Sequence, residues 1–447
     1  MHKISMFGAG YVGLVTATCF AELGNRVYCY DTDRSKITRL QRGDVPIFEP
    51  GLAEMVGRNT NSGRLFFSND PAEVVAQSDI IFIAVGTPMA DDGHADLSYV
   101  RDAAMTIAKH LNAPKIIVNK STVPVQTGDL VATLIDEYRS GGHPVTVVSN
   151  PEFVREGSAI SDFMHPHRVV LGVPDQATGA TMRALYAPLG VSIVLVSVRT
   201  AEMIKYTANA FLATKISFIN EIANLCEAVG ADVKDVVAGA GSDHRIGSEF
   251  LQPGLGFGGS CFPKDVTALT KLAESKNVEP RVLCSVLETN AAQISIYGEA
   301  IAHRIGNLRG VSLALLGLAF KPNTDDVRES PAIALAQWLL ERGAALAVHD
   351  PVASANAQRI LHGNVRWCAD VTDAVRNARA LIVATDWSEY KELDFSALGA
   401  AMAQRLIIDC RNVYEPAEVA KVGFELVAIG RGATKSNASA PHSVEKV

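Results

Sequence analysis

The first 150 residues alternate short apolar runs with amphipathic stretches, as strands and helices do when they follow one another. Each run is bounded by Gly, Pro, Asp or Ser/Thr, which are typical of turns and helix starts. The runs with the length of buried strands are Ile4–Phe7, Val27–Tyr30, Ile80–Val85, Ile116–Asn119 and Thr146–Ser149. Because helix-like sequence separates them, the pattern predicts a doubly wound parallel sheet.

The middle of the chain is predicted to be helical. Apolar residues recur at helical spacing from 199 to about 230, among them Met203, Ala208 and Phe211. Helix-like sequence also follows the glycine-rich stretch 254–259 and continues to about residue 305. A helical segment of this length can connect two lobes and offer a dimer surface.

The strand and helix rhythm returns after residue 310. The new strand candidates are Leu313–Leu316, Ala345–His349, Ala380–Ala384 and Arg405–Asp409. The chain is therefore predicted to be α/β, with two Rossmann-like doubly wound parallel-sheet domains joined by a long central helical segment. We place the first Rossmann-like domain at 1–198, the central helical and dimerisation domain at 199–305, and the second Rossmann-like domain at 306–429. The Ser/Ala/Lys-rich stretch 430–447 lacks periodicity, so we predict a disordered tail.

Composition indicates a globular protein rather than a membrane or nucleic-acid-binding one. The 447 residues are 48% hydrophobic and 20% charged, and no apolar run approaches the roughly 18 residues that span a bilayer. Since Ile4–Phe7 already reads as a strand, we expect no signal peptide and a cytoplasmic location. The net charge of −7 argues against a general nucleic-acid or anionic-membrane partner.

The cysteines and histidines do not predict a metal site. Seven cysteines are scattered without metal-type spacing, which favours reduced thiols. His165-Pro166-His167 has no third ligand at a sensible spacing, so we interpret both histidines as structural and expect no metal.

A G-x-G-x-x-G motif, Gly8-Ala9-Gly10-Tyr11-Val12-Gly13, follows the first predicted strand and opens a helix. The first glycine permits a tight turn, the second lets backbone approach a pyrophosphate, and the third allows close helix–strand packing. Asp31 ends the second strand, where its carboxylate can accept bonds from ribose hydroxyls and would repel a 2′-phosphate. These residues predict NAD rather than NADP as cofactor. The alternative for Asp31 is a simple turn residue, because Asp31-Thr32-Asp33 also suits a turn.

The segment from Gly256 to Asp265 carries a candidate nucleophile, Cys261. Its glycines bring backbone close to a ligand, and Pro263 suits the first turn of a helix. Cys261 would then sit near that helix's N-terminus with Lys264 beside it, and both effects favour the thiolate. The alternative is a buried structural thiol, which we retain for the other six cysteines.

Two further pairs could support such a nucleophile. Lys205 and Asn209 are spaced i, i+4 and share one helix face, where they could steady an oxyanion, although a solvated helix stripe would look the same. Glu152 and Glu156 follow a strand end, where α/β active sites gather, and either could be a general base, position a water, or be a surface acid. Thr122 closes another strand at the lip of the predicted nicotinamide pocket, or is an N-cap, and both can hold.

Several of these segments together resemble the UDP-glucose 6-dehydrogenase family, within the wider group that includes GDP-mannose and UDP-N-acetylmannosamine dehydrogenases. The resemblance runs from Lys3 to about Tyr414. The segments that carry it are Gly8–Gly13, Val85-Gly86-Thr87-Pro88, Lys120–Pro124, Asn150–Gly157, Lys205–Asn209, Phe257–Asp265, Phe320-Lys321 and Arg328-Glu329-Ser330.

The resemblance implies a four-electron oxidation of UDP-glucose to UDP-glucuronate by two NAD molecules in turn. The Cys261 thiolate would form a thiohemiacetal and then a thioester, which water hydrolyses. By resemblance, Lys205 and Asn209 stabilise the oxyanions, while Asp265, Thr122 and Glu156 organise water and proton transfers. Glu152 is either base or positioning residue, and the two roles stay open.

The resemblance also implies the binding residues. The second Rossmann-like domain would bind the UDP-sugar, and the chain would form a homodimer through the central helical segment. Residues implied to contact NAD, besides the glycine motif and Asp31, are Lys36, Thr87, Thr122, Glu156, Lys264 and Arg328. Residues implied to hold the nucleotide sugar are Phe250, Leu251, Gln252, Pro253, Gly254, Gly258 and Lys321, with Glu152, Lys205 and Asn209 at the sugar and Arg245 reaching a diphosphate across a dimer interface.

One position departs from the family pattern, which has glycine where this chain has Cys410. A role for Arg411 near the uridine therefore depends on that glycine not being needed for close approach.

Two other functions share parts of this pattern. A two-electron hydroxyacid dehydrogenase would share the first lobe and the helical bridge but would need no cysteine nucleophile, so the segment around Cys261 argues against it. A non-catalytic nucleotide sensor would be expected to lose Cys261, Lys205 or Asp265, yet all three are present. Within the family, the same chemistry on GDP-mannose or a UDP-N-acetylhexosamine remains the alternative.

Overall fold

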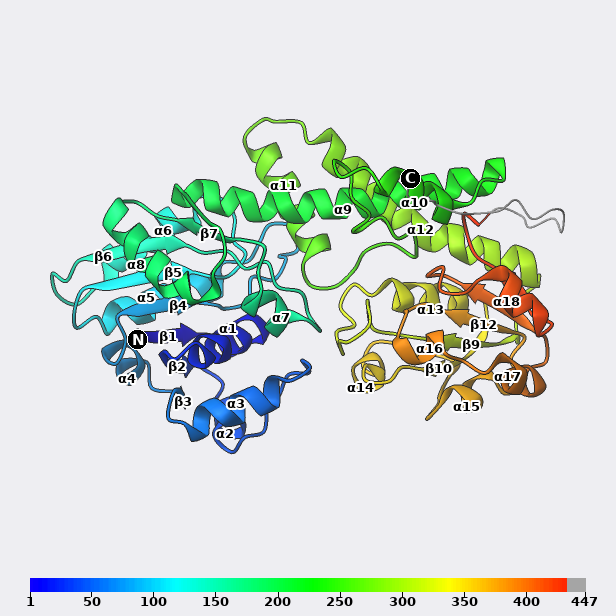
Figure 1. Ribbon diagram of the computed structural model, residues 1–447, viewed down its shortest axis with the longest axis horizontal. Coiled ribbons are helices and arrows are strands. Elements are labelled where there is room, and N and C mark those ends of the chain that lie inside the picture. Colours follow the sequence, from blue (N-terminus) through cyan, green and yellow to red (C-terminus); the bar gives the residue numbers. More distant parts are fainter. Residues whose placement is uncertain (432–447) are drawn as a thin grey trace. The chain divides into compact units, whose positions relative to one another are not determined.

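A computed structural model of the chain describes residues 1–431 (Figure 1). The chain divides into two compact units. The first comprises Met1–Phe211, Ser260–Cys284 and Pro322–Asp325, and the second comprises Leu212–Gly259, Ser285–Lys321 and the chain from Asp326 onward.

The first unit is built on an eight-stranded sheet with the strand order β3-β2-β1-β4-β5-β6-β7-β8. Its strands are β1 (Lys3–Phe7), β2 (Arg26–Tyr30), β3 (Leu65–Ser68), β4 (Ile80–Ile83), β5 (Lys115–Asn119), β6 (Val145–Ser149), β7 (Val169–Gly172) and β8 (Ile193–Val196). The strands pair in parallel except for β6 and β7, which are antiparallel. The order reverses between β1 and β4, which is where ligands bind in doubly wound sheets.

Helices cover both faces of this sheet. Alternate residues of the strands point to opposite faces, so Ile4 and Met6 belong to one apolar cluster while Ile81 and Ile83 belong to another. The helices of this unit are α1 (Tyr11–Glu22), α2 (Arg34–Gln41), α3 (Leu52–Asn61), α4 (Pro71–Ala76), α5 (Ser98–Lys109), α6 (Thr127–Tyr138), α7 (Ala159–Met164), α8 (Gln176–Tyr186) and α11 (Phe262–Ser275).

The second unit repeats the same topology in a six-stranded parallel sheet, with the order β11-β10-β9-β12-β13-β14. Its strands are β9 (Ser312–Leu316), β10 (Ala345–His349), β11 (Val365–Trp367), β12 (Ala380–Val383), β13 (Leu406–Asp409) and β14 (Glu425–Val427). Its helices are α10 (Val233–Gly241), α13 (Pro331–Glu341), α14 (Ser354–Ala357), α15 (Val371–Val375), α16 (Ser388–Lys391), α17 (Phe395–Ala401) and α18 (Pro416–Lys421).

Two long helices, α9 (Val198–Val229) and α12 (Arg281–Ile305), contribute residues to both units, and Figure 1 shows α9 as one continuous helix. The predicted fold class is confirmed: two parallel-sheet α/β lobes and a central helical segment. The prediction missed strands β3, β7, β8, β11 and β14.

The predicted disordered tail, 430–447, lies outside the described residues from 432 onward. Gly430 and Arg431 are described, and both make polar contacts with the rest of the second unit. The Gly430 amide donates to Glu227, and the Arg431 guanidinium pairs with Asp232 and Glu415 at 3.0 Å each. Within residues 1–431, no helix combines the length and apolarity that a membrane crossing requires.

Candidate active site

The turn after β1 has the close backbone packing that its glycines predict. Gly8 has a φ of 108°, and a Cβ there would lie 2.4 Å from the Ala84 carbonyl oxygen on the neighbouring strand connection. A Cβ on Gly13 would lie 1.9 Å from the Gly8 carbonyl oxygen, whereas one on Gly10 would meet open space. The turn therefore leaves room for a ligand at the N-terminus of α1, which suits the pyrophosphate of a dinucleotide.

Asp31 at the end of β2 is tied to this turn. Its carboxylate accepts from the Ala9 amide at 2.8 Å and lies 2.9 Å from the Lys36 ammonium group. Burial opposes its charge, but the bonds from Asp33, Lys36 and Ala9 outweigh burial and lower the pKa of Asp31. An ionised carboxylate beside the turn fits a pair of ribose hydroxyls, so the chain's own residues fit NAD.

Cys261 stands at the start of α11, and Pro263 lies in that helix's first turn as predicted. The cysteine side chain reaches solvent, whereas Lys205 and Asp265, which act on it electrostatically, are buried. The Ser260 hydroxyl lies 3.7 Å from the Cys261 sulfur. An accessible thiol flanked by buried charges is the arrangement of a reactive cysteine rather than a structural one.

The structure pairs Lys264 with Asp265. The Lys264 ammonium group lies 2.5 Å from Asp265 Oδ1, so its charge is engaged there. Desolvation by surrounding atoms and the negative charges of Glu152 and Asp265 raise the pKa of Cys261, while Lys205 is the cation that lowers it. The sequence pointed to the adjacent Lys264, whereas Lys205, which lies 56 positions before Cys261, is the cation seen to lower the pKa of the thiol.

Lys205 and Glu152 form a buried ion pair. Lys205 Nζ lies 3.1 Å from Glu152 Oε1, and the two side chains are 5% and 6% exposed. Burial opposes the charge of Lys205, but Glu152, Cys261 and Asp265 outweigh it and raise the pKa of Lys205. Glu152 also accepts from the Val154 amide at 2.7 Å, which fixes its carboxylate.

Asn209, one turn after Lys205, is bound to Asp265. The Asn209 side-chain amide donates to Asp265 Oδ2 at 2.6 Å, and Asp265 is 1% exposed. The shared helix face of Lys205 and Asn209 thus presents a cation and an amide donor, each held by one carboxylate. Such donors can stabilise an oxyanion without having to reorganise when the reaction occurs.

Glu156 completes the cluster in this unit. Its carboxylate accepts from the Thr324 hydroxyl at 3.1 Å and from the Ser260 hydroxyl at 3.4 Å, so it is linked to the residue beside Cys261. Thr122 follows β5, and its carbonyl accepts from the Thr87 hydroxyl at 2.8 Å. The structure therefore links Cys261, Lys205, Asn209, Asp265, Glu152 and Glu156 in one charged network, and places Thr122 on the segment after β5.

Two buried charged residues here had no predicted role. Lys120 donates to the Asn150 side chain at 3.1 Å; burial lowers its pKa to about 8, with Glu152 opposing the shift and Lys205 adding to it. Glu202 precedes Lys205 by three residues and accepts from two backbone amides at the start of α6, 2.7 and 2.8 Å away. Two features of the sequence could have identified these residues. Glu202 is spaced i, i+3 from Lys205, and Lys120 stands at a strand end.

Apart from Glu152, Lys205 and Asn209, the residues implied for the nucleotide sugar lie in the second unit. Phe250 has a positive φ of 64°, and the Gly254 amide donates to the Asn220 side chain at 2.8 Å. A Cβ on Gly258 would lie 2.1 Å from the Glu329 carbonyl oxygen, so this glycine is required by chain packing whatever it binds. Lys321 lies 5.5 Å from the Phe320 ring centroid.

The implied arginines are exposed and paired. Arg245 lies 2.5 Å from Asp243, and Arg328 lies 2.6 Å from Asp326. Cys410, in place of the family's glycine, is fully buried in the core of the second unit, and a Cβ on Gly254 would lie 3.0 Å from the Cys410 carbonyl oxygen.

Arg411 pairs with Asp386 at 3.1 Å. A Cβ on Gly254 would also lie 3.1 Å from Arg411 Nη1, so Arg411 borders the segment implied for the nucleotide sugar.

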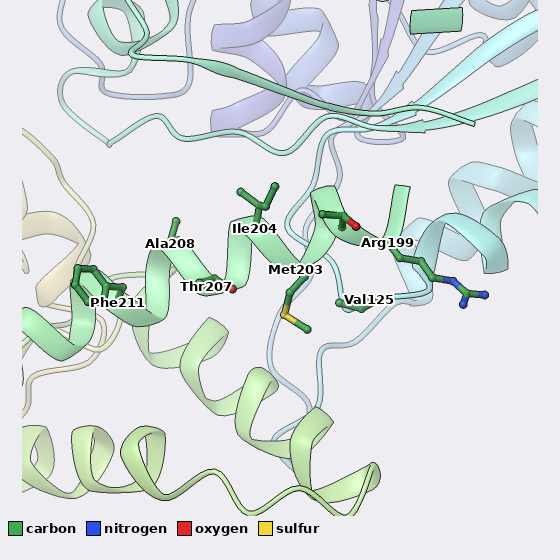
Figure 2. Close-up of a pocket in the computed structure, with 8 residues that line it drawn as sticks. Val125, Arg199, Met203, Ile204, Thr207, Ala208 and Phe211 are labelled. Carbon is green, nitrogen blue, oxygen red and sulfur yellow. The ribbon is translucent and has the colours of Figure 1, made fainter. Parts of the chain in front are cut away.

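A pocket of about 570 Å³ lies on another face of α9 (Figure 2). Residues two apart on a helix point to roughly opposite sides, so Met203 and Thr207 face away from Lys205. The pocket's lining is mostly apolar and includes Val125, Met203, Ile204, Thr207, Ala208 and Phe211. It contains no member of the charged network, so we do not regard it as the catalytic site. Among residues 1–431, no group of three or more His, Cys, Asp or Glu could hold a metal ion.

Three family models match the chain in order. They are the NAD binding domain (residues 2–190), the central domain (199–292) and the UDP binding domain (314–416) of the UDP-glucose/GDP-mannose dehydrogenase family. The chain is 49% identical over 436 residues to a UDP-glucose 6-dehydrogenase of Rhizobium meliloti, covering 96% of this chain and 99% of that protein. It is 48% identical over 435 residues to one of Bacillus subtilis, covering 97% and 94%.

A solved structure is also similar over nearly the whole chain. It is a UDP-glucose dehydrogenase from the hyperthermophilic archaeon Pyrobaculum islandicum, 42% identical, with a TM-score of 0.89 and coverage of 94% of this chain and 96% of that one.

Proposed function

Because the chain belongs to the UDP-glucose/GDP-mannose dehydrogenase family, we propose that this NAD-dependent dehydrogenase oxidises the 6-hydroxymethyl group of UDP-glucose to a carboxylate. The substrate is proposed from the relatives, which are named UDP-glucose 6-dehydrogenases at 48–49% identity over nearly their full length. The observation that carries the chemistry is the accessible Cys261 thiol beside the buried Lys205–Glu152 pair and the Asn209–Asp265 pair.

NAD supplies the hydride acceptor for both oxidations. In the first, C6 loses a hydride and its hydroxyl loses a proton, giving an aldehyde. Lys205 and Asn209 stabilise the negative oxygen that develops at C6. Glu152, which is ion-paired to Lys205, is either the base that takes the proton or the group that holds Lys205 in place.

The second oxidation needs Cys261. Its thiolate adds to the aldehyde carbon and forms a thiohemiacetal, whose oxidation gives a thioester. Water then adds to the thioester carbon, the C–S bond breaks, and the acid and the free thiol are released. Glu156, Asp265 and Thr122 organise that water and its protons, and the bonds that hold Glu156 to Ser260 and Thr324 keep one carboxylate near the thiol.

We assign binding of the two ligands to the two Rossmann-like lobes. The glycine turn 8–13, Asp31, Lys36 and Thr87 hold NAD, with contributions from Lys264 and Arg328. The stretch 250–254, Gly258 and Lys321 hold the nucleotide sugar, and cationic groups such as Lys321 suit its diphosphate.

The experiment that tests the substrate is a comparison of purified protein with NAD and three sugars. We expect kcat/KM for UDP-glucose to exceed that for GDP-mannose and for a UDP-N-acetylhexosamine by at least about 100-fold, since a site built around hydrogen-bonded groups rejects mismatched ones strongly. Comparable or higher kcat/KM with either alternative would overturn UDP-glucose as the substrate.

The apolar face of α9 supports a homodimer. Phe211, Phe218, Leu225 and Val229 are each more than half exposed, and their spacing of seven, seven and four residues puts them on one face. A monomer would leave this stripe in water, whereas a second copy of the chain would bury it. Phe218→Asp should convert a dimer to a monomer in sedimentation analysis, whereas Tyr99→Asp, an exposed aromatic on α5, should not.

A cytoplasmic location is part of the same proposal. All seven cysteines are free thiols in the structure, which is typical of proteins in a reducing compartment.

A further inference from the structure

Glu49 is a buried carboxylate with no cation beside it among the described residues. It lies in the connection between α2 and α3 and is 6% exposed. Its Oε1 accepts from the Ala159 amide at 2.7 Å, and its Oε2 accepts from the Gly157 amide at 2.7 Å and from the Tyr11 hydroxyl. A buried carboxylate is costly unless such donors satisfy it, so the surrounding backbone is organised around its charge.

These bonds join two segments that are far apart in sequence. Tyr11 is the first residue of α1 and stands inside the glycine motif at the cofactor turn. Gly157 closes the segment 150–157, which carries Glu152 and Glu156. The Tyr11 hydroxyl donates to Glu49 and accepts from the Gly157 amide at 3.0 Å, so one carboxylate and one phenol hold both segments.

Two features make the connection rigid. Burial and the hydrogen bond to Glu49 raise the pKa of Tyr11, so its hydroxyl keeps the proton that it donates. Gly157 has a φ of 80°, and a Cβ there would lie 2.5 Å from the Asn323 carbonyl oxygen, so the backbone at this point has little room to move. Glutamine at position 49 would keep one acceptor oxygen and turn an NH₂ group toward a backbone N–H.

We propose that Glu49, together with Tyr11, is a positioning residue that fixes the segment carrying Glu152 and Glu156 relative to the cofactor turn. Its catalytic consequence rests on the proposed function, in which these carboxylates handle the protons and water at C6. Loss of Glu49 should therefore slow hydrolysis of the Cys261 thioester more than it weakens binding of either ligand.

The first test compares Glu49→Gln with Asp175→Asn. Asp175 also accepts a backbone hydrogen bond at a helix N-terminus. It follows β7, which runs antiparallel to β6, so the carboxyl ends of these two strands lie at opposite ends of the sheet. Displacing catalytic groups by about 1 Å can cost about 100-fold in rate. We expect kcat to fall about 10- to 100-fold in Glu49→Gln with both KM values within about threefold, and no change in Asp175→Asn.

Intact-protein mass spectrometry during turnover gives the readout that general destabilisation would not move. A covalent sugar adduct on Cys261 should accumulate in Glu49→Gln above the wild-type level. Tyr11→Phe removes one donor and leaves the two amides on Glu49, so its fall in kcat should be smaller. Wild-type kcat and adduct level in Glu49→Gln would overturn the proposal.

Hydrogen exchange without substrate separates this proposal from the proposed function. In Glu49→Gln, the amides of Gly157 and Ala159 should exchange faster, and so should those of the turn 8–13, whose hydrogen bond to Glu49 comes from Tyr11. Unchanged exchange in the turn would show that Glu49 does not couple the two segments. If wild-type protein makes no NADH from UDP-glucose, the substrate proposal fails, and the exchange result still decides the coupling.

Discussion

The buried Lys205–Glu152 ion pair is expected to contribute more to catalysis than to the stability of the fold. We consider Lys205→Met, which keeps most of the side chain's apolar length and removes its charge. The pair is 3.1 Å apart with both side chains at most 6% exposed. At an effective dielectric constant of about 20, the attraction at that distance is about 5 kcal/mol before desolvation is subtracted.

Lys205→Met leaves Glu152 buried without its partner, and breaking a buried pair in this way costs about 3–5 kcal/mol of stability. It also removes the cation that lowers the pKa of Cys261 and a donor for the oxyanion at C6. Loss of one such donor typically reduces kcat by about 100- to 1,000-fold. The single variant should therefore melt well below wild type and be nearly inactive.

The double variant Lys205→Met/Glu152→Gln separates the two effects. It replaces a buried ion pair with two neutral side chains of similar size, which is often neutral for stability. Asp265 keeps its bonds from Lys264 and Asn209. Buried Lys120 loses the favourable charge of Glu152 and the unfavourable charge of Lys205 together. Thermal unfolding should return most of the way to wild type, while NADH formation at 340 nm stays at least about 100-fold down. A double variant that regains more than about a tenth of wild-type kcat, or a Lys205→Met variant with the melting temperature of wild type, would refute both expectations.

Three other predictions follow from individual groups. The raised pKa of Cys261 means that its alkylation by iodoacetamide in the ligand-free protein should be slower at pH 7 than that of free cysteine and should still rise above pH 8; a plateau below pH 8 would contradict it. Asp31→Ala should lower the ratio of kcat/KM for NAD over NADP by about 10-fold or more, because Lys36 is then free to pair with a 2′-phosphate, and an unchanged ratio would reject the ribose role. Burial raises the pKa of Glu202 from 4.5 to about 7, so the folded state holds that proton more tightly than the unfolded state does. The free energy of unfolding should therefore fall by about 3 kcal/mol as pH rises from below 4.5 to above 7. A difference in melting temperature between wild type and Glu202→Gln that stays constant from pH 4 to pH 8 would exclude this.

The fold was largely predictable because most strands are short, fully apolar and separated by clear helix signals. β10 was predicted with its observed bounds, and α9 within one residue at each end. Three of the five strands that escaped prediction are poorly buried, whereas β7 is apolar and buried throughout and was still missed. β11 and β14 have only three residues each and no fully buried position, and β8 is only partly buried. Their pairing depends on neighbouring strands, which local sequence does not reveal.

The candidate site was predictable where chemistry concentrates in a short segment, as it does around Cys261. It was not predictable where partners come from distant segments. The Asn209–Asp265 bond joins residues 56 positions apart, and the Glu49–Gly157 bond joins residues 108 apart. Neither bond has a local signal, because Glu49 sits in a connection between two helices and reads as an ordinary loop acid. For the same reason, the sequence did not identify Lys205 as a cation acting on the thiol.

The most direct test of the central claim is the number of NADH molecules formed per UDP-glucose when the sugar is limiting and NAD is in excess. We expect two NADH per sugar for wild-type protein, with Cys261→Ser stopping after the first oxidation or turning over only weakly. One NADH per sugar in the wild type, or two with undiminished rate in Cys261→Ser, would contradict a four-electron oxidation through a Cys261 thioester.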